Sequence, residues 1–103
     1  MSNDIKPVIT NPIEEALVIL AEECAEVIKE VTKIQRFGLN HTGPGESITA
    51  RKALAIECGQ LLAMINILKN AGLVTNAELV PAINTKLLKL VDWSNLPVEW
   101  LKP

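Results

Sequence analysis

The chain has 103 residues, of which 49% are apolar and 3% aromatic, and its formal net charge is −2 at neutral pH. This length fits a single domain over residues 1–103, the apolar content suffices for an aliphatic core, and the charge excludes the basic surface that nucleic-acid binding requires. No run of about 18 apolar residues could cross a membrane, and the N-terminus lacks a signal peptide's apolar stretch. The composition therefore predicts a cytoplasmic protein that binds neither membrane nor nucleic acid.

The first predicted element is a long helix over about residues 12–36, which follows an irregular extension, residues 1–11. Asn11 can cap this helix, Pro12 suits its first position, and Gly38 ends it. Apolar residues recur in it with alternating spacings of four and three, which is typical of a bundle helix. These residues are Ile13, Leu17, Leu20, Cys24, Val27, Val31 and Ile34.

Glutamates gather in the middle of this helix. At about 100° per residue, Glu23 lies about 60° from Leu20, at the edge of the apolar stripe, while Glu26 lies one turn further along the same flank and Glu22 points away. Taken alone, such glutamates are typical of a solvated acidic face. The full set is Glu22, Glu23, Glu26 and Glu30, and Cys24 is expected to point inward between them.

Residues 39–47 predict a loop, in which His41 is expected to be exposed without a role. The second helix follows from about residue 49 to 70, with Thr49 as its cap. Glu57 lies about 40° from Leu61 and so falls inside the apolar stripe of this helix, where a carboxylate is costly unless it is paired. The stripe itself comprises Leu54, Cys58, Leu61, Ile65 and Leu68.

The third predicted helix covers about residues 78–92. Asn76 is its candidate cap, and Pro81 is expected within the first turn, where proline is tolerated. Lys86 and Lys89 are three residues apart and share a face. The tail, residues 93–103, carries two Trp and two Pro and is expected to fold back over the bundle or to cover a partner subunit.

The two acidic helices invite a common explanation. If their apolar faces pack together, the oxygens of Glu23, Glu26, Glu57 and Gln60 converge along one side, and a divalent cation would offset the electrostatic cost. Two alternatives stay open at this point: a buried Glu57 paired with a lysine or arginine, and a solvated acidic face on the first helix.

The spacing of these residues resembles a known signature. Glu22-Glu23-x-x-Glu26 followed by Glu57-x-x-Gln60 resembles the EExxE…ExxD motif of the MazG-like all-α nucleoside triphosphate pyrophosphohydrolases. The segment 34–38 is similar to a turn in short phage-type members, and residues 84–89 resemble a family pattern of an asparagine followed by basic residues. The resemblance covers about residues 12–91.

The resemblance implies an enzyme of nucleotide-pool housekeeping in a phage or bacterial cytoplasm. Such enzymes hydrolyse a nucleoside or deoxynucleoside triphosphate to the monophosphate and pyrophosphate, using Mg²⁺, for which Mn²⁺ can substitute. The metal would neutralise the triphosphate and activate a water. The implied catalytic residue is Glu22, as an outer-shell base or a residue that positions the water. The implied metal ligands are Glu23, Glu26, Glu57 and Gln60, and the implied phosphate contacts are Lys33, Arg36, Asn84, Lys86 and Lys89.

Gln60 departs from the family motif, which has Asp at this position. A glutamine carbonyl can still ligate Mg²⁺, but it brings no negative charge, so metal affinity should fall. Two hypotheses follow: an active pyrophosphohydrolase with three carboxylates, or a catalytically impaired module that binds nucleotide or a helical partner. A purely structural helical oligomer is the third hypothesis.

Apolar residues on more than one flank of the first helix predict self-association. Ile19 and Ile28 lie beside the main stripe and would leave apolar surface uncovered in a three-helix chain. The resemblance implies homodimers or homotetramers with four-helix bundles at the subunit contacts. The expected fold is therefore all-α, with three main helices whose four-helix-bundle packing is completed by oligomerisation.

Overall fold

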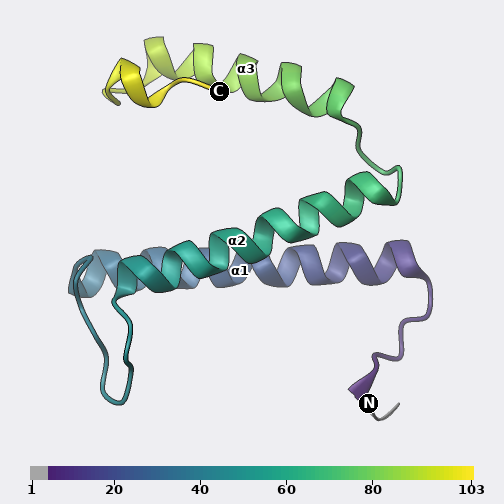
Figure 1. The fold of residues 1–103 in the computed structure, drawn as a ribbon, viewed down its shortest axis with the longest axis horizontal. Coiled ribbons are helices and arrows are strands. Elements are labelled where there is room, and N and C mark those ends of the chain that lie inside the picture. Colours follow the sequence, from purple (N-terminus) through teal and green to yellow (C-terminus); the bar gives the residue numbers. More distant parts are fainter. Residues whose placement is uncertain (1–4) are drawn as a thin grey trace. The chain divides into compact units, whose positions relative to one another are not determined.

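The computed structural model describes residues 5–103 and divides the chain into two units, Met1–Leu68 and Lys69–Pro103. The described residues form three α-helices and a 3₁₀ turn, and no strand occurs among them. The expected all-helical class with three main helices is thus confirmed (Figure 1). The completion of a four-helix bundle by a second subunit stays a prediction, as does the assignment of residues 1–103 to one domain.

Helix α1 spans Pro12–Phe37, one residue beyond the expected end. The Asn11 side chain accepts hydrogen bonds from the backbone N–H groups of Ile13 and Glu14 at 3.0 and 3.1 Å. Gly38 stops the helix with a φ of 93°, a conformation that disfavours other residues. Local chemistry alone therefore sets both ends of α1, as the sequence predicts.

Helix α2 spans Ala50–Asn70 and is capped by Thr49, whose Oγ1 accepts from the Lys52 N–H at 3.2 Å. The loop before it is tied to its first turn. The Ala50 N–H donates to the His41 carbonyl at 2.8 Å, and the Arg51 N–H donates to the Leu39 carbonyl at 2.9 Å. These bonds hold the loop against the end of the helix.

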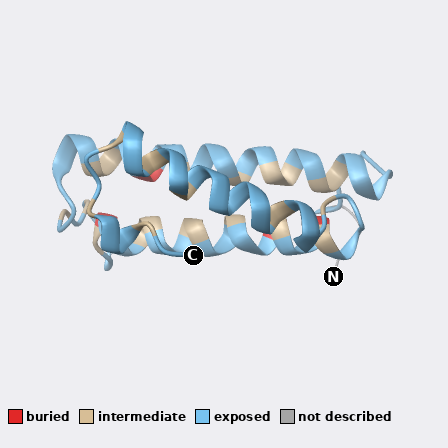
Figure 2. Ribbon diagram, turned by 90° about the horizontal axis from the view of Figure 1, so that it is seen from above, coloured by how far each residue is buried: buried red, intermediate tan, exposed pale blue. Residues whose placement is uncertain are grey.

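Helices α1 and α2 form an antiparallel hairpin (Figure 1). The start of α1 meets the end of α2, where Ala16 and Ile19 share a cavity with Met64 and Ile67. Within residues 5–103 the side chains classed as buried are three apolar ones on α2 and one carboxylate on α1 (Figure 2): Ala50, Met64, Leu68 and Glu30.

The buried face of α1 matches the expected stripe only in part, since Leu20, Val27 and Ile34 are half-buried but its other members are exposed. Glu23, Val27 and Glu30 are among its less exposed residues, whereas Leu17 is 45% exposed and Cys24 is exposed. The inward position expected for Cys24 is therefore wrong for the single chain. The physical reason is that α1 carries more apolar residues than α2 covers, so some of them, such as Leu17, stay exposed. On α2 the expected stripe is the less exposed one, and Cys58 is partly buried.

The second unit contains α3, which spans Asn76–Trp93. Its start lies before the expected residue 78, and its cap is Thr75 instead of Asn76. Thr75 Oγ1 accepts from the Glu78 N–H at 3.2 Å, while the Glu78 carboxylate accepts from the Thr75 N–H at 3.1 Å. This reciprocal pair nucleates the helix ahead of Pro81, so the proline falls in the second turn.

The tail turns back along α3 within this unit (Figure 1). A 3₁₀ turn, η2, covers Val98–Trp100, and Leu101 and Pro103 line a groove of about 350 Å³ with Asn84, Leu87, Leu88 and Val91. The tail is therefore packed on α3 itself. In the part of the chain that the structure describes, no helix has the length and apolarity to span a membrane.

Candidate functional site

The two glutamate-bearing segments meet across the α1–α2 hairpin. In the orientation that satisfies both carboxylates, the Gln60 amide nitrogen donates to Glu23 Oε2 at 3.2 Å and to Glu57 Oε2 at 3.0 Å. Glu23 comes from α1, and Glu57 and Gln60 come from adjacent turns of α2. Glu23 and Glu57, 34 positions apart in sequence, thus accept hydrogen bonds from the same amide nitrogen. We name this arrangement the Gln60 bridge.

Like charges crowd around Glu57. The pKa of this half-buried side chain is raised above its ordinary value of 4.5, first because burial disfavours the charged form. The negative charges of Glu26, Glu23 and Glu30 raise the pKa further, while the positive charge of Lys29 lowers it. Glu26 and Glu30 therefore lie near enough to Glu57 to act on its charge. Of the carboxylates expected to converge, Glu23 and Glu57 are joined through Gln60, while Glu26 and Glu30 act on Glu57 through their charge alone.

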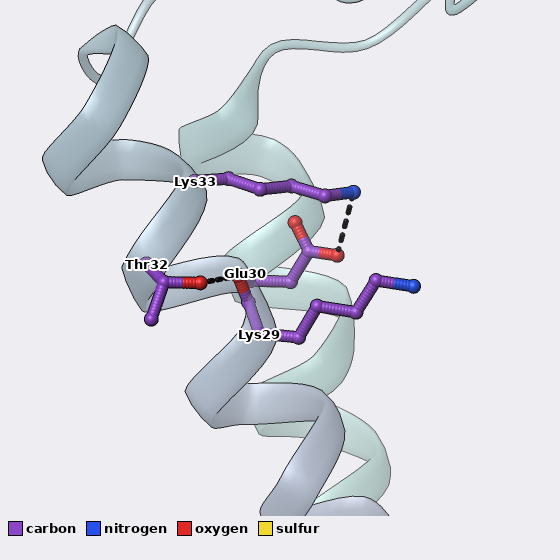
Figure 3. Close-up of polar contacts among 4 residues, drawn as sticks. All are labelled: Lys29, Glu30, Thr32 and Lys33. Atoms are coloured by element: carbon purple, nitrogen blue, oxygen red, sulfur yellow. Dashed lines mark hydrogen bonds and ion pairs between the residues drawn. The ribbon is translucent and has the colours of Figure 1, made fainter.

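Glu30 is the residue whose position the sequence interpretation missed, since it was treated as part of a solvated face. It is only 6% exposed, and its Oε1 lies 3.4 Å from Lys33 Nζ (Figure 3). Its Oε2 is buried and has no hydrogen-bond partner among residues 5–103. A signal was present: Glu30 follows Glu23 by seven residues, two helical turns, and so shares its face. The seven-residue spacing of Glu23 and Glu30 is missed when the buried face is predicted from apolar residues alone.

A cavity of about 430 Å³ adjoins the carboxylates, and we name it the acidic cavity. Glu30 and Lys33 of α1 line it together with Ile56 and Glu57 of α2 and Glu46 of the loop. Both signs of charge therefore face the same space, which suits a ligand that carries phosphates together with a cation.

The remaining candidates are distributed over both units. Glu22 is exposed on α1, Lys33 pairs with Glu30, and the Arg36 guanidinium lies 4.7 Å from the centre of the Phe37 ring. Asn84, Lys86 and Lys89 are exposed on α3, in the second unit, so their contact with the same ligand stays a prediction.

The oxygen donors suit a hard divalent cation. Glutamate and amide oxygens are the ligands that Mg²⁺ prefers, and a cation beside Glu57 would offset the burial and the repulsion that together raise its pKa. Among residues 5–103, no three His, Cys, Asp or Glu side chains come together as a group that could hold a metal ion. The convergence shown here comprises two carboxylates joined by an amide.

Comparisons of the chain with protein-family models, with curated proteins and with solved structures found no match.

Proposed function

We propose that this chain is a MazG-like nucleoside triphosphate pyrophosphohydrolase, which hydrolyses a nucleoside or deoxynucleoside triphosphate to the monophosphate and pyrophosphate. The observation that carries the proposal is the Gln60 bridge, because it joins Glu23 of the first motif to Glu57 of the second. Two glutamate motifs on solvated faces would have no reason to meet.

In this proposal, Glu23, Glu26, Glu57 and the Gln60 carbonyl hold Mg²⁺, for which Mn²⁺ substitutes. Rotation of the Gln60 amide would turn its oxygen toward the cation and release the two carboxylates from its nitrogen. The cation, when bound, supplies charge neutralisation of the triphosphate and a water of lowered pKa.

The chain's own side chains bind and orient the substrate. Lys33 stands at the acidic cavity and would contact a phosphate oxygen as a point charge, and Arg36 lies one turn further along α1. Glu22, exposed beside Glu23, would accept a proton from the attacking water through the outer shell of the metal. The protein would form a homodimer or homotetramer in the cytoplasm of a bacterium, whether the protein is bacterial or from a phage. In this oligomer the phosphate contacts would be completed by Asn84, Lys86 and Lys89.

The test is a panel of the common nucleoside and deoxynucleoside triphosphates, incubated with the protein and Mg²⁺ or Mn²⁺, with pyrophosphate and monophosphate as the readout. We expect release of pyrophosphate from at least one triphosphate and its loss in Glu57→Gln. Absence of release over the whole panel at high protein concentration would refute the enzymatic proposal.

A second candidate function is a nucleotide-binding or helical interaction module without turnover. The donor role of Gln60 favours it, because the amide nitrogen already satisfies two carboxylates that an enzyme would reserve for metal. This candidate expects native protein that binds nucleotide without hydrolysing it, and expects Gln60→Asp to create hydrolysis.

A further inference from the structure

A second cavity lies beyond the acidic one, between the last turns of α1, the loop and the start of α2. It measures about 350 Å³ and has a mostly apolar lining, which we name the loop cavity. Small-molecule sites commonly have such a size, with apolar walls and a few placed polar groups. The charged and aromatic side chains of its lining are Glu30, Lys33, Arg36, Phe37, His41 and Glu46.

The parts that form the loop cavity contact one another. The Ala50 N–H holds the His41 carbonyl at 2.8 Å, and the Phe37 and His41 rings stack with their centres 4.7 Å apart and an interplanar angle of 27°. The Arg36 guanidinium lies 4.7 Å from the Phe37 ring centre. Flat groups thus line the cavity before any ligand enters, and Phe37 remains half exposed.

One polar atom of Glu30, a residue that lines both cavities, lacks a partner among the described residues. Only 6% of the Glu30 surface is exposed. Its Oε1 accepts a hydrogen bond from Lys33 Nζ at a long 3.4 Å, and its Oε2 has no donor within the described residues. A carboxylate oxygen only accepts hydrogen bonds, and leaving one buried and unpaired is costly. A ligand that brings N–H groups to Glu30 would remove this cost.

We infer that the loop cavity is the nucleobase subsite of the proposed triphosphate site, and that Glu30 selects guanine. Guanine offers a ring N–H and an amino group side by side, so a carboxylate meets donors alone. Adenine and cytosine place a ring acceptor beside their amino group, and uracil flanks its N–H with two carbonyls that a carboxylate repels. The flat side chains supply the stacking surface that every base accepts.

The order of the residues along α1 agrees with this assignment, which rests on the proposed function for its phosphate end. Glu23, Glu30 and Phe37 follow one another at seven-residue intervals, so they lie on one face of α1 in steps of about 10 Å. Glu30 lines both cavities, with Glu57 on one side and Phe37 on the other. A nucleotide can thus place phosphates at the carboxylate–lysine end and its base in the loop cavity.

The test measures binding of GMP, AMP, CMP and UMP by calorimetry in the absence of divalent metal, so that hydrolysis plays no part. We expect GMP to bind most tightly. Glu30→Gln, which replaces an acceptor oxygen with a donor, should weaken GMP binding about tenfold to a hundredfold and remove the preference. Glu14→Gln, the same change at an exposed position of α1, should leave the preference intact, and Phe37→Leu should weaken all four ligands.

Equal affinities for the four monophosphates would overturn the inference, and so would an unchanged preference in a folded Glu30→Gln variant. Loss of Mn²⁺ binding in that variant with the base preference retained would also overturn it, by making Glu30 a metal ligand. Preference for GMP without pyrophosphate release from any triphosphate would overturn the pyrophosphohydrolase proposal and support the base assignment. Pyrophosphate release without a base preference would support the pyrophosphohydrolase proposal and overturn the base assignment.

Discussion

With its amide oriented to satisfy both carboxylates, Gln60 donates from its nitrogen to Glu57 Oε2 at 3.0 Å and to Glu23 Oε2 on the other helix at 3.2 Å. The amide thereby occupies the position where the resemblance expects a fourth carboxylate, after Glu23, Glu26 and Glu57. The group that most weakens the case for metal binding is also the group that holds the two motifs together.

Replacing Gln60 is therefore the most informative change at the site. Gln60→Asp adds a negative oxygen ligand and should raise Mg²⁺ affinity and pyrophosphate release about tenfold to a hundredfold. Calorimetric titration with Mg²⁺ and a pyrophosphate assay, each beside native protein, measure the two effects. A variant that is folded and gains neither would contradict the placement of the metal.

The raised pKa of Glu57 makes stability depend on pH. Because the folded state holds this proton more tightly than the unfolded state, Glu57 contributes stability below its ordinary value of 4.5 that is lost as pH rises through the folded pKa. We expect the native protein without metal to lose stability relative to Glu57→Gln as pH rises above about 4.5. Urea unfolding of both proteins between pH 4 and pH 7, about the range concerned, measures the difference. Parallel curves would contradict the prediction, and Glu14→Gln serves as the control.

Divalent cations should stabilise the folded chain if the carboxylates hold them. A ligand that binds the native state adds about 2.7 kcal/mol at a concentration of 100 times its Kd. We expect Mg²⁺ or Mn²⁺ to raise the melting temperature of native protein and to have a much smaller effect on Glu23→Gln. If neither the cations nor the triphosphate changes the melting temperature, the hypothesis of a purely structural oligomer is favoured instead.

Lys33 is the partner that keeps Glu30 buried. Lys33→Met preserves the length of the side chain and leaves both Glu30 oxygens unpaired, which should cost about 1–3 kcal/mol of the free energy of unfolding. Thermal or urea unfolding measures this loss. Lys52→Met, at an exposed lysine of α2, is the matched control, and an equal effect of the two changes would show that the Glu30–Lys33 pair has no special weight.

The helices could be predicted from sequence because their ends depend on local chemistry. Asn11, Pro12 and Gly38 act on neighbouring backbone groups, so their roles need no knowledge of the fold. The start of α3 was harder, because both Thr75 and Asn76 are good capping residues, and the choice depends on the reciprocal bond with Glu78.

The burial of Glu30 and the exposure of Cys24 could not be predicted in the same way. Both depend on which side of α1 meets α2, and α1 has apolar residues on more than one side. Glu57 was predictable because α2 has one clear stripe. The loop cavity depends on bonds between residues nine or more apart, such as Ala50 to His41, which no local pattern encodes.

The exposed apolar side of α1 predicts self-association. Ile13, Leu17 and Ile28 are 46%, 45% and 63% exposed in the single chain, more apolar surface along one helix than a soluble monomer usually presents. Ile28→Glu would place a charge in the centre of such a contact, and burying an unpaired charge costs several kcal/mol. We expect light scattering to give a dimer or tetramer for native protein and a monomer for Ile28→Glu. Asn66→Glu, an exposed change on α2, should leave the assembly intact, and a monomeric native protein would contradict the prediction.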